Sequence, residues 1–388
     1  MAALECVRRG RRPLLIERGR LGTGATGASL GIIHGGLRYL QSLDVARWRR
    51  SRAEQLWFAS QFPSHVTSLR CVMPLYRGTI RSRLMFRAAF RAQSAARRLA
   101  GLNGEPGGAG LLSAQEVRAR FPVPENGLVG AAFWDELSIV DSGALMRALA
   151  GRIVAGGGTI IENETVIGLR LRSGQVIGVA SRSAETHQPT LHDADLVLNC
   201  AGAGAQALAA KFDRAIPQLS CRVLAFNLLL DAPMSGAEAL AVSPVPGRGR
   251  SLFLRPHPRG TLAGTGYSFL PEGANDVAVP QRWISAFLDD VAQAVPALAG
   301  ARHLEVWAGR LPDNGRRIPG LRDRDVVWNH GRHNGPKGLV TLTATKLTTA
   351  HAHARAVLDR LWPDRVVPER RSVLQRSGDP FGVEWKAE

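Results

Sequence analysis

The richest chemistry in the chain is concentrated in ten residues, 31–40, which run Gly-Ile-Ile-His-Gly-Gly-Leu-Arg-Tyr-Leu. Glycine has no Cβ, so Gly35 and Gly36 allow the backbone to approach a flat ligand closely. Arg38 and Tyr39 then place a permanent cation and a phenol next to that ligand. The segment therefore predicts a cofactor-facing turn with a contact for an anion.

His34 lies within this segment and is a candidate base or hydrogen-bond partner for the ligand. A satisfied structural histidine is the alternative interpretation. Further cations occur at Arg310 and at Lys346, which is one of only four lysines among the 50 basic residues. Arg322 and Arg324 are additional candidates for an anion contact, and the sequence does not choose between them.

Three strand-and-turn units are expected to position these residues. In the first, a short apolar strand at 13–17 ends in Glu17 and leads through a loop of small residues, including Ser29, into segment 31–40. An acid at the end of the second strand of a dinucleotide-binding βαβ unit bonds the ribose hydroxyls. Glu17 occupies that place.

The second unit is a buried strand at 196–200 that runs into Ala201, Gly202 and the start of a helix. The third is a strand at 338–344 followed by Thr-Lys-Leu-Thr-Thr and another helix. Small residues after a buried strand are typical of a place where backbone meets a nucleotide cofactor. A helix N-terminus also carries a partial positive charge. We therefore expect a cofactor to lie along the ends of these strands.

These units predict an α/β protein with a Rossmann-like nucleotide-binding domain. Residues 221–307 are instead rich in short strands, with one helix at 281–294, which indicates a separate, mostly antiparallel substrate domain. The Gly-rich turn that should precede the first helix, at 1–10, is absent from the sequence. We expect the coding region to extend upstream by roughly 20 residues, and a fragment is the alternative.

Segment 31–40 closely resembles the segment that passes the flavin ring in FAD-dependent glycerol-3-phosphate dehydrogenases, within the D-amino-acid-oxidase-like flavoprotein superfamily. Segment 307–312 resembles the Gly-x-Arg-Pro segment of that family, although Leu311 separates Arg310 from the proline. Segment 344–349 resembles the family's Gly-Gly-Lys-Leu-Thr-Thr turn, with both glycines replaced.

The resemblance implies FAD as the cofactor and a glutathione-reductase-type FAD-binding domain with an inserted, mostly antiparallel β substrate domain. The expected FAD-binding residues are Glu17, Ser29, Gly35, Gly36, Val166, Ala201, Gly202, Lys346, Leu347 and Thr348. The expected catalytic residues are His34, Arg38, Arg310 and Lys346, and the expected substrate-binding residues are Arg38, Tyr39 and Arg310. We expect no metal ion.

The function implied is oxidation of an anionic hydroxyl compound, glycerol-3-phosphate or a similar molecule, by hydride transfer to flavin N5. Cationic side chains would hold its phosphate or carboxylate, and the electrons would pass to a quinone or another acceptor. One alternative is an amine or amino-acid oxidase on the same scaffold. A second alternative is a non-catalytic fragment that no longer binds FAD.

The resemblance also divides the chain into six segments. The FAD-binding parts are expected at 1–75, 141–220 and 308–365, the substrate-domain parts at 76–140 and 221–307, and a tail at 366–388. The oligomeric state is not specified by the sequence.

The net charge of +18 comes from scattered arginines without a nucleic-acid-binding motif, so we expect no nucleic-acid partner. A basic helical segment, 81–102, is interpreted either as a membrane-surface helix or as a solvated helix packed on its own domain. No run of 18 apolar residues occurs. Four cysteines without metal or redox spacing indicate packing roles in a reducing cytosol. We therefore expect a cytoplasmic protein, with contact at the inner face of the membrane as the alternative.

Overall fold

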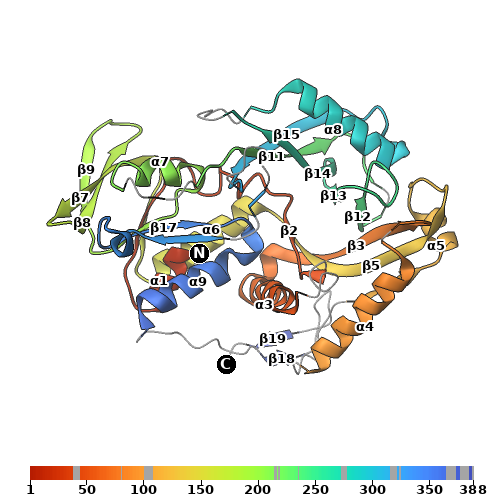
Figure 1. Cartoon of the computed structure of the whole chain (residues 1–388), viewed down its shortest axis with the longest axis horizontal. Coiled ribbons are helices and arrows are strands. Elements are labelled where there is room, and N and C mark those ends of the chain that lie inside the picture. Colours follow the sequence, from red (N-terminus) through yellow and green to blue (C-terminus); the bar gives the residue numbers. More distant parts are fainter. Residues whose placement is uncertain are drawn as a thin grey trace.

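The chain folds into two small sheets, each containing a parallel strand pair, beside one large, mostly antiparallel sheet, as shown by a computed structural model (Figure 1). The structure describes residues 1–37, 44–79, 81–99, 108–213, 216, 219–234, 236–271, 278–314, 321–322, 325–363, 373–375 and 384–386. Arg38 and Tyr39 of the predicted cofactor-facing segment lie outside these residues.

The parallel pairings join segments that are far apart in the sequence. Strand β1 (Leu14–Ile16) pairs with β6 (Thr159–Ile161), and β10 (Val197–Asn199) pairs with β17 (Leu339–Thr343), which β16 (Val326–Asn329) joins in the antiparallel sense. The helices of this part are α1 (Ala2–Arg8), α3 (Val45–Gln61), α6 (Ser142–Ala155), α7 (Ala205–Ala209) and α9 (Ala350–Leu361). A separate antiparallel sheet contains β7 (Glu164–Arg172), β8 (Gln175–Ser183) and β9 (Pro189–Asp193).

Within the described residues, the large sheet has nine strands, of which only the β12–β3 pair is parallel. Its order is β15 (His303–Leu311), β11 (Val223–Leu230), β14 (Gly260–Phe269), β13 (Leu252–His257), β12 (Ala239–Val242), β3 (Val66–Tyr76), β5 (Leu128–Ile139) and β2 (Ile32–Ile33), with β4 (Ala109–Leu112) also paired to β5. The predicted α/β class with a mostly antiparallel substrate domain is confirmed.

Strand β3 belongs to the large sheet, although most of its residues lie in the segment 1–75 that was predicted to be part of the FAD-binding domain. Strand β15 likewise crosses the boundary expected between residues 307 and 308. The boundaries of the six segments remain predictions, and the sheet shows only which strands hydrogen-bond to one another.

Capping and apolar spacing explain why two of these helices form where they do. The Asp141 carboxylate accepts hydrogen bonds from the backbone N–H groups of Gly143 and Ala144, at 2.7 and 3.1 Å, and so caps α6. Helix α8 (Gln281–Ala294) buries Ile284, Phe287, Val291 and Ala294 at helical spacing. Phe287 of this stripe packs against Phe226 of β11 with ring centroids 5.5 Å apart, so α8 covers that face of the large sheet.

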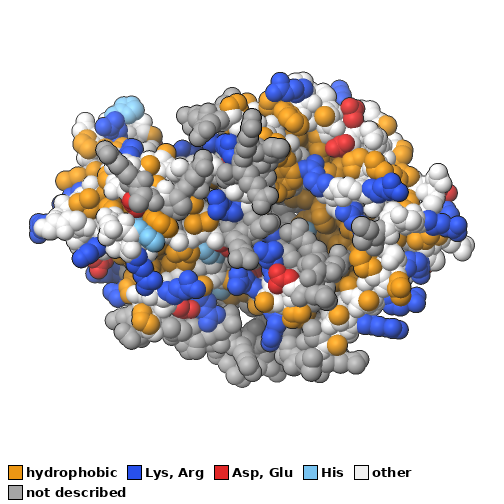
Figure 2. Space-filling view, viewed as in Figure 1, with side chains coloured by type: hydrophobic (Ala, Val, Ile, Leu, Met, Phe, Trp, Pro, Cys, Tyr) orange, Lys and Arg blue, Asp and Glu red, His pale blue; other side chains and the backbone are white. Residues whose placement is uncertain are grey.

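Two surface observations bear on the sequence predictions. No helix among the described residues combines the length and apolarity needed to cross a membrane. Basic side chains are scattered over the face shown in Figure 2 rather than gathered into one patch. Cys6, Cys71 and Cys221 are buried, as a packing role requires, whereas the residue Cys200 is exposed although burial raises the pKa of its thiol to about 11. It lies just after β10, where the chain leaves the sheet.

Candidate active site

Strand β2 brings the glycine-rich segment to the edge of the large sheet. Ile32 and Ile33 pair with Ser138 and Leu137 of β5. Gly31 and Gly36 both have positive φ, at 76° and 84°, a conformation that favours glycine. At Gly35 a Cβ would lie 2.7 Å from the Gln55 Oε1 of α3. The close approach of α3 therefore explains why position 35 is a glycine.

A buried carboxylate, Glu136 of β5, holds this segment in place, and no sequence pattern singled it out. Glu136 is 3% exposed and accepts hydrogen bonds from Trp134 Nε1 and Gln55 Nε2, both at 2.9 Å, and from the Gly35 backbone N–H. Its Oε1 lies 3.4 Å from His34 Nδ1. Because Nδ1 faces the carboxylate, Nε2 is the nitrogen left to accept a proton.

Strand β13 forms a wall against this segment. The Phe253 ring packs on the His34 imidazole with centroids 5.2 Å apart. Two residues further along the same face, the Arg255 Nε donates a hydrogen bond to the Leu30 carbonyl at 2.7 Å. The His34 side chain is 45% exposed, so the imidazole remains accessible between these groups.

Arg310 lies on the other face of the large sheet. It pairs with Leu224 across β15 and β11, and directly opposed residues project to the same face. By alternation that is also the face of Phe226, which α8 covers. The Arg310 Nε donates to the Cys221 carbonyl at 2.9 Å. The structure does not bring Arg310 to His34, and its substrate-binding role remains a prediction.

The ends of the parallel strands present several open polar positions. Glu17 follows β1 and accepts the Gly19 N–H through Oε1 at 3.0 Å. The Ser29 Oγ and the Thr343 Oγ1 at the end of β17 are buried and have no hydrogen-bond partner among the described residues. After β10, Gly202 has a φ of 55° and no described atom within 4 Å of where its Cβ would be. These groups leave room and hydrogen-bonding capacity for a ligand.

The turn after β17 contains the predicted lysine. Lys346 is exposed and precedes the short helix η5 (Leu347–Thr349), in which Thr348 is 7% exposed. Thr345, just before it, donates from its backbone N–H and its hydroxyl to the Asp325 carboxylate at 2.9 and 3.1 Å. Neither η5 nor α9 has a side-chain cap. Leu347 packs against the core that contains α6 and α3.

The remaining predicted nucleotide contacts are separated along the chain. Val166 lies in β7 and pairs with Ser181 of β8. The Ala201 backbone N–H donates to the Asn199 side chain at 3.3 Å, which shapes the turn before Gly202. These residues have the expected secondary-structure context, and their roles in binding remain predictions.

A buried ionic cluster, which the sequence did not reveal, links α9 to α1 and α3. His351 is 1% exposed, with Nδ1 2.9 Å from Glu54 and Nε2 3.2 Å from Glu5. Its ring stacks on Trp57 at 3.8 Å. Burial opposes charge on the imidazole, but hydrogen bonds to Glu5 and Glu54 outweigh it and raise the pKa of His351. The cluster fixes the first turn of α9, five residues after Lys346.

Parallel strands that end in a glycine turn, beside an antiparallel wall, form the arrangement in which α/β proteins bind a nucleotide cofactor. The chain belongs to the FAD dependent oxidoreductase family, which matches residues 1–360. The predicted FAD dependence and family resemblance are thereby confirmed.

The curated relatives at 22–28% identity are named as glycerol-3-phosphate dehydrogenases. Glycerol-3-phosphate dehydrogenase 1 of Mycobacterium tuberculosis is 28% identical over 369 residues, covering 92% of this chain and 69% of that protein. The aerobic glycerol-3-phosphate dehydrogenase of Bacillus subtilis is 22% identical over 373 residues, with 95% and 65% covered. This chain thus spans about two thirds of the length of these relatives.

The solved structures show the fold. A glycerol-3-phosphate dehydrogenase from Bacillus halodurans, solved with FAD, has a TM-score of 0.69 at 19% identity, with 95% of this chain and 63% of that chain covered. Glycine oxidase from Bacillus cereus has a TM-score of 0.66 at 16% identity, with 95% and 96% covered. At these identities the likeness extends to the fold alone.

The residues present fit FAD. The unpartnered hydroxyls of Ser29 and Thr343 supply hydrogen bonds that a polar cofactor can accept, and the open Gly202 turn admits it without a Cβ in the way. The Gly19 N–H uses Oε1 of Glu17, and the role of this carboxylate in binding the ribose remains a prediction.

Proposed function

We propose that the protein oxidises a secondary hydroxyl group on a small anionic substrate, with glycerol-3-phosphate as the first candidate. The names and coverage of the curated relatives support the substrate class. The observation in the structure that carries the proposal is the His34–Glu136 contact beside the cofactor-facing segment. An alcohol loses its hydroxyl proton as its carbon loses hydride, so this reaction needs a base.

Each side chain has a separate role in the proposed oxidation. The bound flavin supplies the hydride acceptor. The His34 Nε2 takes the proton from the substrate hydroxyl, while Glu136 orients the ring through Nδ1 and stabilises the imidazolium that forms. Trp134 and Gln55 hold Glu136 by hydrogen bonds, so the carboxylate cannot turn away from His34. Arg38 and Lys346 supply positive charge for the substrate and cofactor.

The deciding experiment is anaerobic reduction of the purified flavoprotein. Glycerol-3-phosphate is expected to bleach the flavin absorbance, whereas glycine and other amino acids leave it unchanged. Bleaching by amino acids alone would assign the chain to the alternative class of amine oxidases. Protein that purifies without flavin and takes up none on adding FAD would support the non-catalytic alternative.

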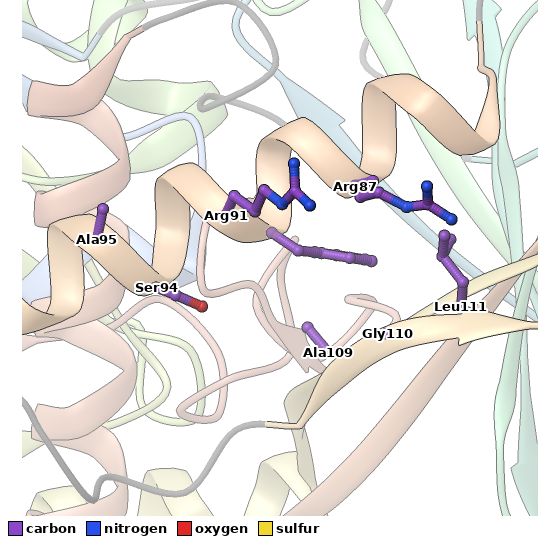
Figure 3. Close-up of a pocket in the computed structure, with 8 residues that line it drawn as sticks. Arg87, Arg91, Ser94, Ala95, Ala109, Gly110 and Leu111 are labelled. Atoms are coloured by element: carbon purple, nitrogen blue, oxygen red, sulfur yellow. The ribbon is translucent and has the colours of Figure 1, made fainter.

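We also propose that the electrons leave to a quinone and that α4 (Arg83–Leu99) contacts the membrane surface. Leu84 is 75% exposed on α4. Arg87 and Arg91 project from the helix over an open groove of about 600 Å³ along Ala109, Gly110 and Leu111 of β4 (Figure 3). Cosedimentation with phosphatidylglycerol vesicles that is lost in an Arg87→Glu, Arg91→Glu variant is the expected result. Equal binding of both proteins would exclude the contact.

A further inference from the structure

Arg255 is a cation on the β13 wall that faces residues 30–34. Its side chain is partly buried, and no described carboxylate forms an ion pair with it. Burial lowers the pKa of its guanidinium, which nevertheless stays charged at neutral pH. By contrast, Arg70 of β3 is paired with Asp135 at 3.0 Å, and Arg259, in the turn after β13, is paired with Glu305.

The contacts of Arg255 use only part of its hydrogen-bonding fork. The Nε donates to the Leu30 carbonyl at 2.7 Å, and Nη1 makes a long contact of 3.5 Å to the Pro256 carbonyl. Nη2 has no acceptor in the described part of the chain. It lies 3.2 Å from where a Cβ on Gly31 would be, so the glycine leaves space for the guanidinium.

A partly buried cation without an acid loses hydration that only neutral carbonyl groups replace. Such an arrangement is typical of a site where the ligand brings the opposite charge. Arg255 follows Phe253 on the same face of β13, and Phe253 packs on His34. Two strand residues span roughly 7 Å, so Arg255 and the residue that contacts the candidate base are near neighbours on one face of β13.

We propose that Arg255 binds the anionic oxygens of the substrate through its outer nitrogens, while its Nε holds the Leu30 carbonyl. This inference rests on the proposed function, because it assigns a residue to the same substrate. It also gives this face of the sheet a cation, since Arg310 lies on the face covered by α8. Arg255 thereby selects anionic hydroxyl compounds over neutral ones.

The variant Arg255→Gln separates anion binding from support of the loop. The Nε2 of glutamine is as many bonds from Cβ as the Nε of arginine, so it can keep the hydrogen bond to Leu30 while the charge and the outer fork are lost. The matched control is Arg259→Gln, which removes an exposed cation from the same hairpin. Binding of inorganic phosphate by calorimetry and the KM for glycerol-3-phosphate are the two readouts.

We expect Arg255→Gln to weaken phosphate binding and to raise the KM by about 10- to 100-fold, with unchanged flavin content and melting temperature. Oxidation of neutral glycerol should change little, and Arg259→Gln should match the parent in every assay. Arg255→Lys should recover part of the loss, because an ammonium keeps the charge without the planar fork.

A flavin-loaded Arg255→Gln protein with the phosphate affinity and KM of the parent would overturn the inference. A parent protein that does not bind phosphate would overturn it too. If glycerol-3-phosphate fails to reduce the parent, the proposed function fails, yet the calorimetry still decides the role of Arg255. Loss of flavin and stability with unchanged phosphate affinity in the loaded fraction would assign Arg255 to loop support alone.

Discussion

The smallest unit that carries a chemical prediction is the His34–Glu136 pair. Replacing His34 with Gln removes the proton acceptor, so flavin reduction by glycerol-3-phosphate should slow by about 10²- to 10⁴-fold. FAD content should stay the same, because the imidazole is 45% exposed and contributes little packing. Stopped-flow absorbance measures the rate. An unchanged rate would show that His34 is structural.

Lys346 supports a second prediction for a single residue. Its exposed position before η5 places a charge in the turn that resembles the family's flavin-contacting segment. Lys346→Met should lower the flavin reduction potential by about 30 mV, equivalent to roughly 1.4 kcal/mol for two electrons. Potentiometric titration of the flavin measures this shift. Identical potentials in variant and parent would place Lys346 away from the ring.

Individual residues also show what a sequence can and cannot reveal about a site. The string around His34 was informative because glycines, a histidine and an arginine occur together. Glu136 carried no signal, since it directly follows Asp135 and looks like half of an acidic pair. Alternation along β5 sends the two side chains to opposite faces, so Asp135 pairs with Arg70 near the surface while Glu136 is buried.

At the scale of elements, the cluster around His351 ties three helices together and predicts a pH dependence. The raised pKa of His351 means that its stabilising charge is complete below pH 6.5 and is lost as the pH rises through the folded value. Burial opposes the charge on Glu5, but His351 and Arg9 lower its pKa to about 2, so its contribution is present above pH 4.5. The cluster therefore stabilises most between these two values.

The variant His351→Gln tests this prediction. Its melting temperature should fall furthest below that of the parent between pH 4.5 and 6.5, and the gap should narrow toward pH 9. Scanning calorimetry at constant FAD concentration measures both proteins. The charged groups that face His351 are Glu5 and Arg8 of α1 and Glu54 of α3, and Arg9, just after α1, pairs with Glu5. A gap that does not vary with pH would show that the imidazole is neutral throughout.

Elements differ in how well local sequence determines them. The helix predicted at 281–294 occurs at those bounds as α8, because Pro280 precedes an unbroken apolar stripe. Helix α6 likewise begins where the Asp141 carboxylate can cap it. The parallel pairing of β12 with β3 joins Ala239 to Cys71, and no local pattern specifies a partner so distant. The contacts of His351 with Glu5 and Glu54 could not be predicted either, because these residues are also far apart in the sequence.

At the scale of the whole molecule, bound FAD is expected to stabilise the folded state. The buried, unpartnered hydroxyls of Ser29 and Thr343 and the open turn at Gly202 come from three distant parts of the chain, so a ligand that contacts all three would hold them together. Free FAD at 100 times its dissociation constant should stabilise the fold by about 2.7 kcal/mol. Thermal melts with and without added FAD measure the effect. Coincident melts would show that the folded chain does not bind the cofactor.

The parallel pairing of β12 with β3 also implies a delay between the synthesis of β3 and the synthesis of its partner strand. Strand β3 is complete once Tyr76 has been made, but its neighbour β12 ends at Val242. At about 5–20 residues per second, the ribosome needs roughly 10–30 s to make the intervening chain. During that interval β3 and β5 can pair, yet the outer edge of β3 has no neighbour. The nascent polypeptide therefore exposes an unsatisfied strand edge until β12 has been made, and pairing of that edge with another chain is the hazard during this interval.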